Sequence, residues 1–152
     1  MAFTIRQGNT NDFPAILALI KELALFENAP EKVTNTVAQM EEEQALFNTV
    51  VVENEQGEII AMMLYYFTYY TWVGKSLYLD DLYVKKAYRG NEIGKKLIKK
   101  LFSIAKENNC KRVRWQVLDW NEPAIAFYKK LGATLDGEWI NCDFDKQQII
   151  DF

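Results

Sequence analysis

Apolar positions recur along the chain with two spacings, one typical of helices and one typical of strands. The three- and four-residue spacing predicts helices that each bury one apolar face. They are expected from Thr10 or Asn11 to about Glu27, from Thr34 or Thr36 to Gln44, over 92–108, and over 122–131 before Gly132. Runs rich in β-branched and aromatic residues predict strands. They are expected over residues 3–6, 49–53, 58–70, 76–84, 112–118 and 138–144, with a last helical turn capped by Asp145.

This order of elements predicts an α/β (α+β) fold with a mixed central sheet and helices packed on it. The chain has 152 residues and shows no internal repeat and no linker-like change of composition. We therefore expect a single domain over residues 1–152.

The composition excludes several kinds of active site. The chain has no histidine, which rules out Ser-His-Asp and Cys-His nucleophiles and zinc sites built with imidazole. Cys110 and Cys142 are far apart and match no metal-binding spacing. Ser76 and Ser103 lie in no nucleophile-elbow motif. No metal is expected, and an enzyme of this composition has to work with carboxylates, tyrosine and backbone groups.

The net charge of −3 disfavours nucleic acid as the main partner, because phosphate contacts normally need a basic surface. A mildly acidic protein suits a cationic substrate better. No apolar run approaches the length of a membrane helix, and the first residues lack a signal-peptide pattern. We expect a cytoplasmic protein with no membrane partner.

The most informative segment runs from Leu79 to Lys95, where a strand ends, a loop carries Arg-Gly, and a helix begins with glycine in its first turn. Free amides at a helix N-terminus form a phosphate site, and glycine lets a pyrophosphate approach the backbone. An ordinary helix start is the alternative interpretation, because the loop fits neither a Walker motif nor a complete Gly-x-Gly-x-x-Gly fingerprint.

This segment resembles the acetyl-CoA motif Arg/Gln-x-x-Gly-x-Gly/Ala of the GCN5-related N-acetyltransferases (GNAT). It stands here as Arg89-Gly90-Asn91-Glu92-Ile93-Gly94, with Glu92 at the first motif glycine. The resemblance implies a GNAT-like, mostly antiparallel sheet with two splayed strands and helices on both faces. It also implies that the backbone of Leu82, Tyr83 and Val84 pairs with the pantetheine arm. The amides of Gly90 through Lys95 would hold the pyrophosphate, near the charges of Arg89 and Lys95.

A second block, residues 119–133, resembles the later family motif Asn-x-x-Ala-x-x-Phe-Tyr-x-x-x-Gly-Phe/Ala. Together with residues 20–27, 65–75 and 77–81, it is similar to the diamine (spermidine/spermine) and thialysine N-acetyltransferase branch. The resemblance implies that Tyr128 is the general acid for the departing sulfur, whereas an aromatic that only packs is the alternative. It implies coenzyme contacts at Asn121, Pro123 and Ala124.

The resemblance also implies acceptor-binding carboxylates. Asp80 matches the group that binds the amine and, through water, removes its proton. Because neighbouring strand residues point to opposite faces, we expect only one of Asp80 and Asp81 in the pocket; Asp80 is preferred and Asp81 stays open. Phe26 and Glu27 match substrate-side positions, with Glu27 holding a distal ammonium; an exposed glutamate at the helix end without such a role is the alternative for Glu27. Residues 41–43, a run of glutamates, are expected to be a solvated face; a second role in attracting a polycation is the alternative.

The sequence therefore predicts an acetyl-CoA-dependent N-acetyltransferase for the primary amine of a small cationic acceptor, a diamine, polyamine or thialysine-like compound. A protein amine or another amine is an alternative acceptor. A non-catalytic acetyl-CoA-binding sensor is a further alternative, indicated by Glu92. The branch implies a homodimer, for which the aromatic stretch 65–72 offers apolar surface.

Overall fold

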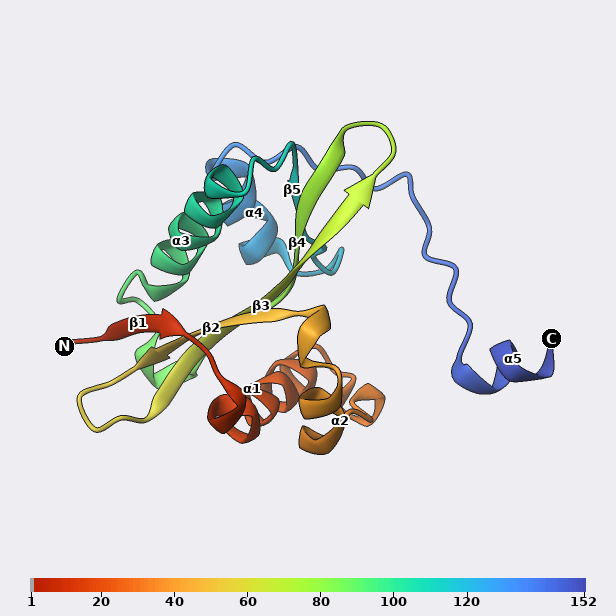
Figure 1. The fold of residues 1–152 in the computed structure, drawn as a ribbon. Helices are drawn as coiled ribbons and strands as arrows, with labels where there is room; N and C mark the ends of the chain where they lie inside the picture. Colours follow the sequence, from red (N-terminus) through yellow and green to blue (C-terminus); the bar gives the residue numbers. More distant parts are fainter. Residues whose placement is uncertain (1) are drawn as a thin grey trace. The chain divides into compact units, whose positions relative to one another are not determined.

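The computed structural model describes residues 2–152, and the chain divides into two compact units, residues 1–116 and 117–152. The first unit contains the sheet and three α-helices, and the second contains two short helices (Figure 1). The single domain over residues 1–152 stays a prediction.

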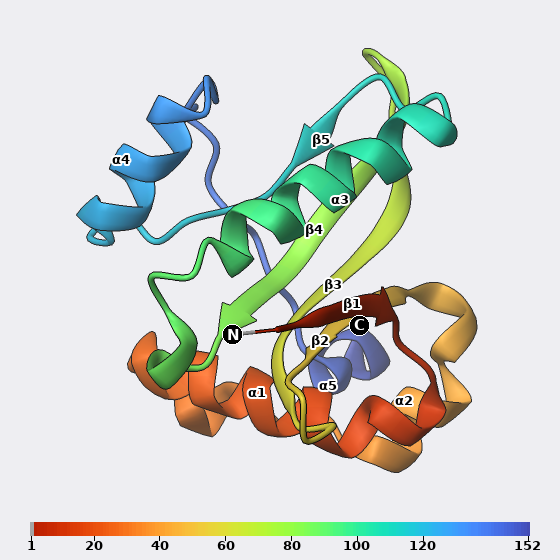
Figure 2. The same ribbon diagram turned by 90° about the vertical axis from the view of Figure 1, so that its left-hand side faces the viewer.

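The sheet of the first unit has five strands in the spatial order β1-β2-β3-β4-β5. Neighbours from β1 to β4 pair antiparallel, and β5 runs parallel to β4 (Figure 2). The bounds are Thr4–Gln7 for β1, Asn48–Glu53 for β2, Ile59–Tyr70 for β3, Gly74–Val84 for β4 and Val113–Arg114 for β5. The prediction of a mixed, mostly antiparallel sheet is confirmed.

β4 and β5 pair over a short distance only. The ladder joins Leu77 with Val113 and Tyr78 with Arg114, so in the described part of the chain β4 has no strand on this edge from Leu79 onward. This confirms the prediction of splayed strands. The strand expected over 112–118 is consequently much shorter, because the chain leaves the ladder and Trp115 packs against α3, its ring 6.4 Å from that of Phe102.

Helices cover both faces of the sheet, as predicted. Alternation along the strands separates two cores, because successive side chains point to opposite faces. α1 (Phe13–Phe26) and α2 (Val37–Glu42) pack on the face that includes Val51 and Met62. α3 (Ile93–Glu107) packs on the other face, against Val50 and Met63 among others. Its buried positions follow the predicted helical spacing.

The starts of the first two helices depend on polar caps. The Asn9 side chain, rather than Thr10 or Asn11, caps the chain's first helical segment, the 3-10 turn Thr10–Asp12 that leads into α1. Asp12 accepts two 2.8 Å hydrogen bonds from Arg6, which fixes this turn to β1. For α2 the cap is Thr36, whose Oγ accepts a 3.1 Å hydrogen bond from the Gln39 amide, so Thr36 rather than Thr34 opens the helix.

The second unit contains α4 (Glu122–Lys130) and α5 (Lys146–Asp151). Gly132 follows α4 with a φ of +95°, as expected of a glycine after a helix end. Asp145 caps α5, as expected. The strand predicted over 138–144 is wrong: this stretch forms neither helix nor strand. Its apolar side chains are exposed, Ile140 to 88%, because no strand in the second unit pairs with it.

No helix within residues 2–152 combines the length and the apolar character needed to cross a membrane. The aromatic β3–β4 hairpin exposes large side chains, 74% of Tyr69 and 82% of Trp72. The homodimer and the cytoplasmic location stay predictions.

Candidate active site

A β-bulge in β4 positions the two neighbouring aspartates. Leu64 of β3 pairs with Asp81, but Tyr65 pairs with Leu79, so Asp80 is an extra residue without a partner on β3. One extra residue shifts the alternation of side chains along the strand. Leu79 packs on the α3 side before the bulge and Leu82 packs there after it. Asp80 and Asp81 therefore both lie on the α1 side.

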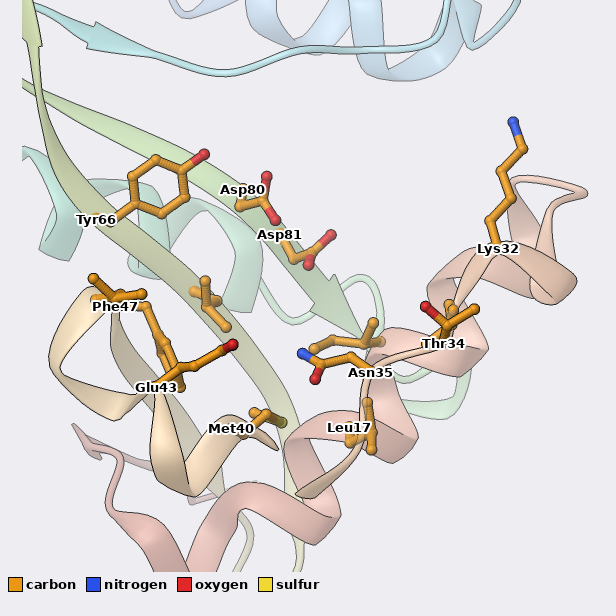
Figure 3. Close-up of a pocket in the computed structure, with 14 residues that line it drawn as sticks. Leu17, Lys32, Thr34, Asn35, Met40, Glu43, Phe47, Tyr66, Asp80 and Asp81 are labelled. Carbon is orange, nitrogen blue, oxygen red and sulfur yellow. The ribbon is translucent and has the colours of Figure 1, made fainter. Parts of the chain in front are cut away.

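The prediction that only one of the two aspartates faces the pocket is wrong. Both line a cavity of about 590 Å³ in the first unit, because the bulge breaks the strict alternation on which the prediction was based. Figure 3 shows Asp80 and Asp81 side by side near the end of β4, with Glu43 and Asn35 extending toward each other from the opposite wall. The cavity is lined by Leu17, Ile20, Lys32, Val33, Thr34, Asn35, Met40, Glu43, Leu46, Phe47, Leu64, Tyr66, Asp80 and Asp81.

The carboxylates of this region are unusually weak acids. Burial, and then the negative charges of Asp80 and Glu27, raise the pKa of Asp81 to about 7. Loss of hydration in the cavity raises the pKa of Asp80, and burial raises that of Glu27 at the end of α1. A carboxyl pair that gains and loses a proton near neutral pH is suited to general base chemistry and to binding a cation.

Asp81→Asn is expected to raise the thermal unfolding midpoint at pH 8 but not at pH 4. Folding raises the Asp81 pKa from 3.8 to about 7, so its protonated form stabilises the folded chain, and this stabilisation is lost as the pH rises through that range. The amide never ionises. At pH 8 the free energy of unfolding of the variant should exceed that of wild type by about 1–3 kcal/mol, which raises the unfolding midpoint on the order of 5 °C. This value is smaller than the full pKa shift implies, because the carboxyl group contacts solvent.

The measurement is differential scanning calorimetry at pH 4, 6 and 8. Asp119→Asn, at an exposed position of the second unit, is the matched control and is expected to show no such pH-dependent gain. A shift for Asp81→Asn that is the same at all three pH values contradicts the account of a carboxyl weakened by burial.

Two tyrosines flank the aspartates. The rings of Tyr66 and Tyr78 stack with centroids 5.4 Å apart. Burial and the negative charge of Asp80 raise the pKa of Tyr78 to about 12, and the same two causes raise that of Tyr66. Both phenols therefore stay protonated at neutral pH. Tyr66, which lines the cavity, serves there as an aromatic wall that carries a hydroxyl group.

The loop between β4 and α3 has the backbone of an anion site. Gly90 and Glu92 have φ of +82° and +60°, both in the left-handed region. Glu92 is the residue before α3, and its side chain makes no capping hydrogen bond. The first-turn amides of Ile93, Gly94 and Lys95 therefore point out of the helix end, where they form no bond within the helix. A β-carbon on Gly94 would meet only Leu82, at 4.0 Å.

Side-chain hydrogen bonds stabilise this loop internally and join it to the end of β4. Asn91 Nδ2 donates to the Tyr88 carbonyl at 3.0 Å, and Arg89 Nε donates to the Val84 carbonyl at 3.0 Å. The Arg89 guanidinium also lies 5.4 Å from the Tyr83 ring centroid and 5.9 Å from that of Phe26. Phe26 and Arg89 thus contact each other, and neither is among the side chains that line the cavity.

The remaining predicted coenzyme residues divide between the two units. In the first unit, the Ile93 side chain is buried in the core, whereas Lys95 is exposed. In the second unit, Asn121 caps α4 by accepting a 3.4 Å hydrogen bond from the Ala124 amide, with Pro123 in the first turn. Tyr128 is half-buried on α4, its ring centroid 5.7 Å from that of Phe127.

The cavity wall formed by α2 and the segments beside it was not predicted from the sequence. Glu41, Glu42 and Glu43 are exposed, as expected of a solvated face, and Glu43 in addition lines the cavity together with Asn35 and Phe47. Glu43 keeps its helical position at the end of α2, because its amide donates to the Gln39 carbonyl at 3.0 Å. The cap at Thr36 and the four-residue spacing of Gln39 and Glu43 are local sequence signals for this wall.

The sequence profile of the Acetyltransferase (GNAT) family matches residues 14–133, which is most of the chain. The chain belongs to the GNAT family. The match extends from the start of α1 through α4 and so includes the bulge and the loop before α3. As a GNAT protein with amine N-acetyltransferase relatives, the chain is an acyltransferase that acts on amines.

Two curated GNAT relatives resemble the chain over nearly its whole length. Thialysine N-epsilon-acetyltransferase of Bos taurus is 39% identical over 145 residues, covering 88% of this chain and 85% of the relative. Spermidine/spermine N(1)-acetyltransferase-like protein 1 of Homo sapiens is 36% identical over 162 residues, covering 98% of this chain and 23% of that protein.

A solved structure shares the fold. A predicted acetyltransferase from Clostridium acetobutylicum, whose crystal structure contains acetyl-CoA, superimposes with a TM-score of 0.76 at 19% identity, covering 93% of this chain and 96% of that one. Within residues 2–152, no group of three or more Cys, Asp or Glu side chains is arranged to hold a metal ion.

Proposed function

We propose that this GNAT protein transfers the acetyl group of acetyl-CoA directly to a primary amine of a small cationic acceptor, a diamine, polyamine or thialysine-like compound. The observation that carries the proposal is the carboxyl pair Asp80 and Asp81 on one wall of a cavity of about 590 Å³. This volume suits a small molecule, and the charge suits a cation. The similarity to a thialysine N-epsilon-acetyltransferase and to a spermidine/spermine N(1)-acetyltransferase-like protein supports the acceptor class.

The residues of the first unit fit acetyl-CoA. The edge of β4 that lacks a strand partner includes Leu82, Tyr83 and Val84, and extended backbone on such an edge can pair with the amides of a pantetheine arm. The amides at the start of α3 suit a pyrophosphate, because helix N-termini favour negative charge. Arg89 stabilises the loop through its bond to Val84, and Lys95 adds positive charge at the helix start.

The carboxyl pair would prepare the nucleophile. An amine has to lose a proton before it can attack, and we propose that Asp80, at the exposed end of the pair, receives this proton through a water molecule. Asp81, whose pKa is raised to about 7 by burial and by the charges of Asp80 and Glu27, keeps the pair able to hold a proton near neutral pH. After this transfer, the carboxyl pair holds the proton that the ammonium group has lost.

Tyr128 would complete the exchange of protons. Acetyl-CoA supplies an acetyl thioester, in which the bond to sulfur breaks as the bond to nitrogen forms. We propose that the Tyr128 hydroxyl donates its proton to the departing sulfur and regains one from the nitrogen. Asn121 Oδ1 caps α4, the helix that carries Tyr128, so its Nδ2 group is available as a donor to the pantetheine arm, next to Pro123 and Ala124.

Glu92→Gly is expected to tighten acetyl-CoA binding by about three- to tenfold. The substitution removes a carboxylate from the proposed pyrophosphate site and places the residue that best tolerates a φ of +60° at that position. Isothermal titration with acetyl-CoA gives the affinity. Glu107→Gly, at the other end of α3, is the control and leaves the affinity unchanged. Equal affinity for Glu92→Gly and wild type would show that the carboxylate does not act on the pyrophosphate.

Glu92 also raises the alternative of a coenzyme-binding sensor, and one experiment separates it from an enzyme. The chain is mixed with acetyl-CoA, with and without a mixture of small amines, and free thiol is followed over time. Thiol release that depends on amine supports the transferase. Binding of acetyl-CoA without release at any amine concentration supports the sensor.

A further inference from the structure

We infer that Glu43 binds the second cationic group of the acceptor, in the cavity wall opposite Asp80 and Asp81. The inference rests on the proposed function and extends it, because it assigns a specificity-determining residue and favours acceptors with two cationic groups. The experiment below gives different results when the proposed function fails and when only the assignment of Glu43 fails.

The position of Glu43 follows from the end of α2. Glu43 is the cap residue that follows Glu42, its amide still donates to the Gln39 carbonyl at 3.0 Å, and its side chain lines the cavity. Gln39 Nε2 donates to Glu43 Oε1 at 3.2 Å, which orients the carboxylate. In Figure 3 this carboxylate extends toward Asn35 on the side of the cavity across from the aspartates. A second acidic group therefore stands apart from the first pair.

The cavity that these acidic groups share has an apolar and aromatic part, formed by Met40, Phe47, Leu64 and Tyr66, beside the polar side chains of Thr34 and Asn35. Such a lining removes methylene groups from water, which is favourable for a hydrocarbon chain, whereas the carboxylates on both walls favour ammonium groups. The arrangement corresponds to an acceptor with two ammonium groups separated by an alkyl chain. An acceptor with one amine would leave Glu43 without a cationic partner.

Two other charged residues are less suited to this role. In the described part of the chain, Glu27 lies outside the set of residues that line the cavity, although its charge acts on Asp81. The assignment of the distal ammonium thus moves from Glu27 to Glu43. Lys32 does line the cavity, but Figure 3 shows its side chain extending away from the other labelled residues, so its charge is not directed at the acceptor.

The test compares two acceptors of equal chain length, 1,4-diaminobutane and butylamine, by thiol release from acetyl-CoA. Wild type is expected to favour the diamine in kcat/KM. Glu43→Gln keeps the size and the acceptor oxygen for Gln39 but removes the charge, so it should lower the ratio of diamine to monoamine about five- to tenfold, mainly through the KM of the diamine.

Glu42→Gln is the matched control. It removes the same charge from the exposed residue directly before Glu43, and Glu42 does not line the cavity. Its ratio should equal that of wild type. An unchanged ratio in Glu43→Gln, or an equal fall in Glu42→Gln, overturns the assignment. A wild type that acetylates both amines equally well also overturns it and leaves the proposed function standing. No thiol release with either amine, or with spermidine, spermine and thialysine, overturns the proposed function itself.

Discussion

Tyr128→Phe lowers the turnover number for amine acetylation by about 100- to 1,000-fold, while the affinity for acetyl-CoA stays within a factor of two. The substitution removes one hydroxyl group and keeps the ring that packs beside Phe127 on α4. If the hydroxyl protonates the departing sulfur, its loss affects the transition state and not the binding of the coenzyme. Steady-state thiol release and isothermal titration with acetyl-CoA measure the two quantities.

Tyr69→Phe is the control for this prediction. It removes the same hydroxyl group from a side chain that is 74% exposed on the β3–β4 hairpin, and its turnover should equal that of wild type. Turnover of Tyr128→Phe within threefold of wild type would exclude the hydroxyl as the general acid. A parallel loss of coenzyme affinity would instead indicate that Tyr128 supports the binding site.

Removal of the carboxyl pair is expected to have the second large effect. Asp80→Asn and Asp81→Asn should each lower kcat/KM about 100-fold or more, because the ammonium then loses either its binding partner or its proton acceptor. In wild type, kcat/KM should rise with pH through about 7, since the active form of the pair has lost the proton that burial and the charges of Asp80 and Glu27 keep on Asp81.

The pH profile separates a role in proton transfer from a role in structure. In Asp81→Asn the group that titrates near 7 is gone, so the rise in the remaining activity should move to lower pH, where Asp80 ionises. Glu41→Gln, which removes an exposed carboxylate of α2, should keep the wild-type profile. Unchanged profiles in both aspartate variants would show that the pair takes no part in the chemistry.

The strands and helices of the first unit could be predicted from the sequence because each has a clear local signal. α3 is the best case: Ile93, Leu97 and Leu101 recur at helical spacing and are all buried in the core. The helix caps were harder to predict, because several neighbouring polar residues near a helix start could each serve as the N-cap. Asn9 and Thr36 are identified as the caps by the hydrogen bonds that their side chains accept from particular amides. The sequence alone does not distinguish these two residues from the neighbouring candidates.

The candidate site could be predicted only in part, because a bulge is a property of two paired strands. Nothing in Leu79-Asp80-Asp81-Leu82 by itself marks Asp80 as the extra residue; the register with Leu64 and Tyr65 does so. Strict alternation therefore gave the wrong result for the second aspartate. The same limit applies to residues 138–144, whose apolar pattern fits a strand but which find no partner strand in the second unit.

Thiol release from acetyl-CoA across a panel of acceptors tests the central claim most directly. The panel contains spermidine, spermine, 1,4-diaminobutane, thialysine, lysine and a peptide with a free N-terminus, and mass spectrometry identifies each acetylated product. The account predicts efficient turnover with one or more of the small cationic amines and little with the peptide. Efficient turnover with the peptide alone, or acetyl-CoA binding without turnover of any acceptor, would contradict it.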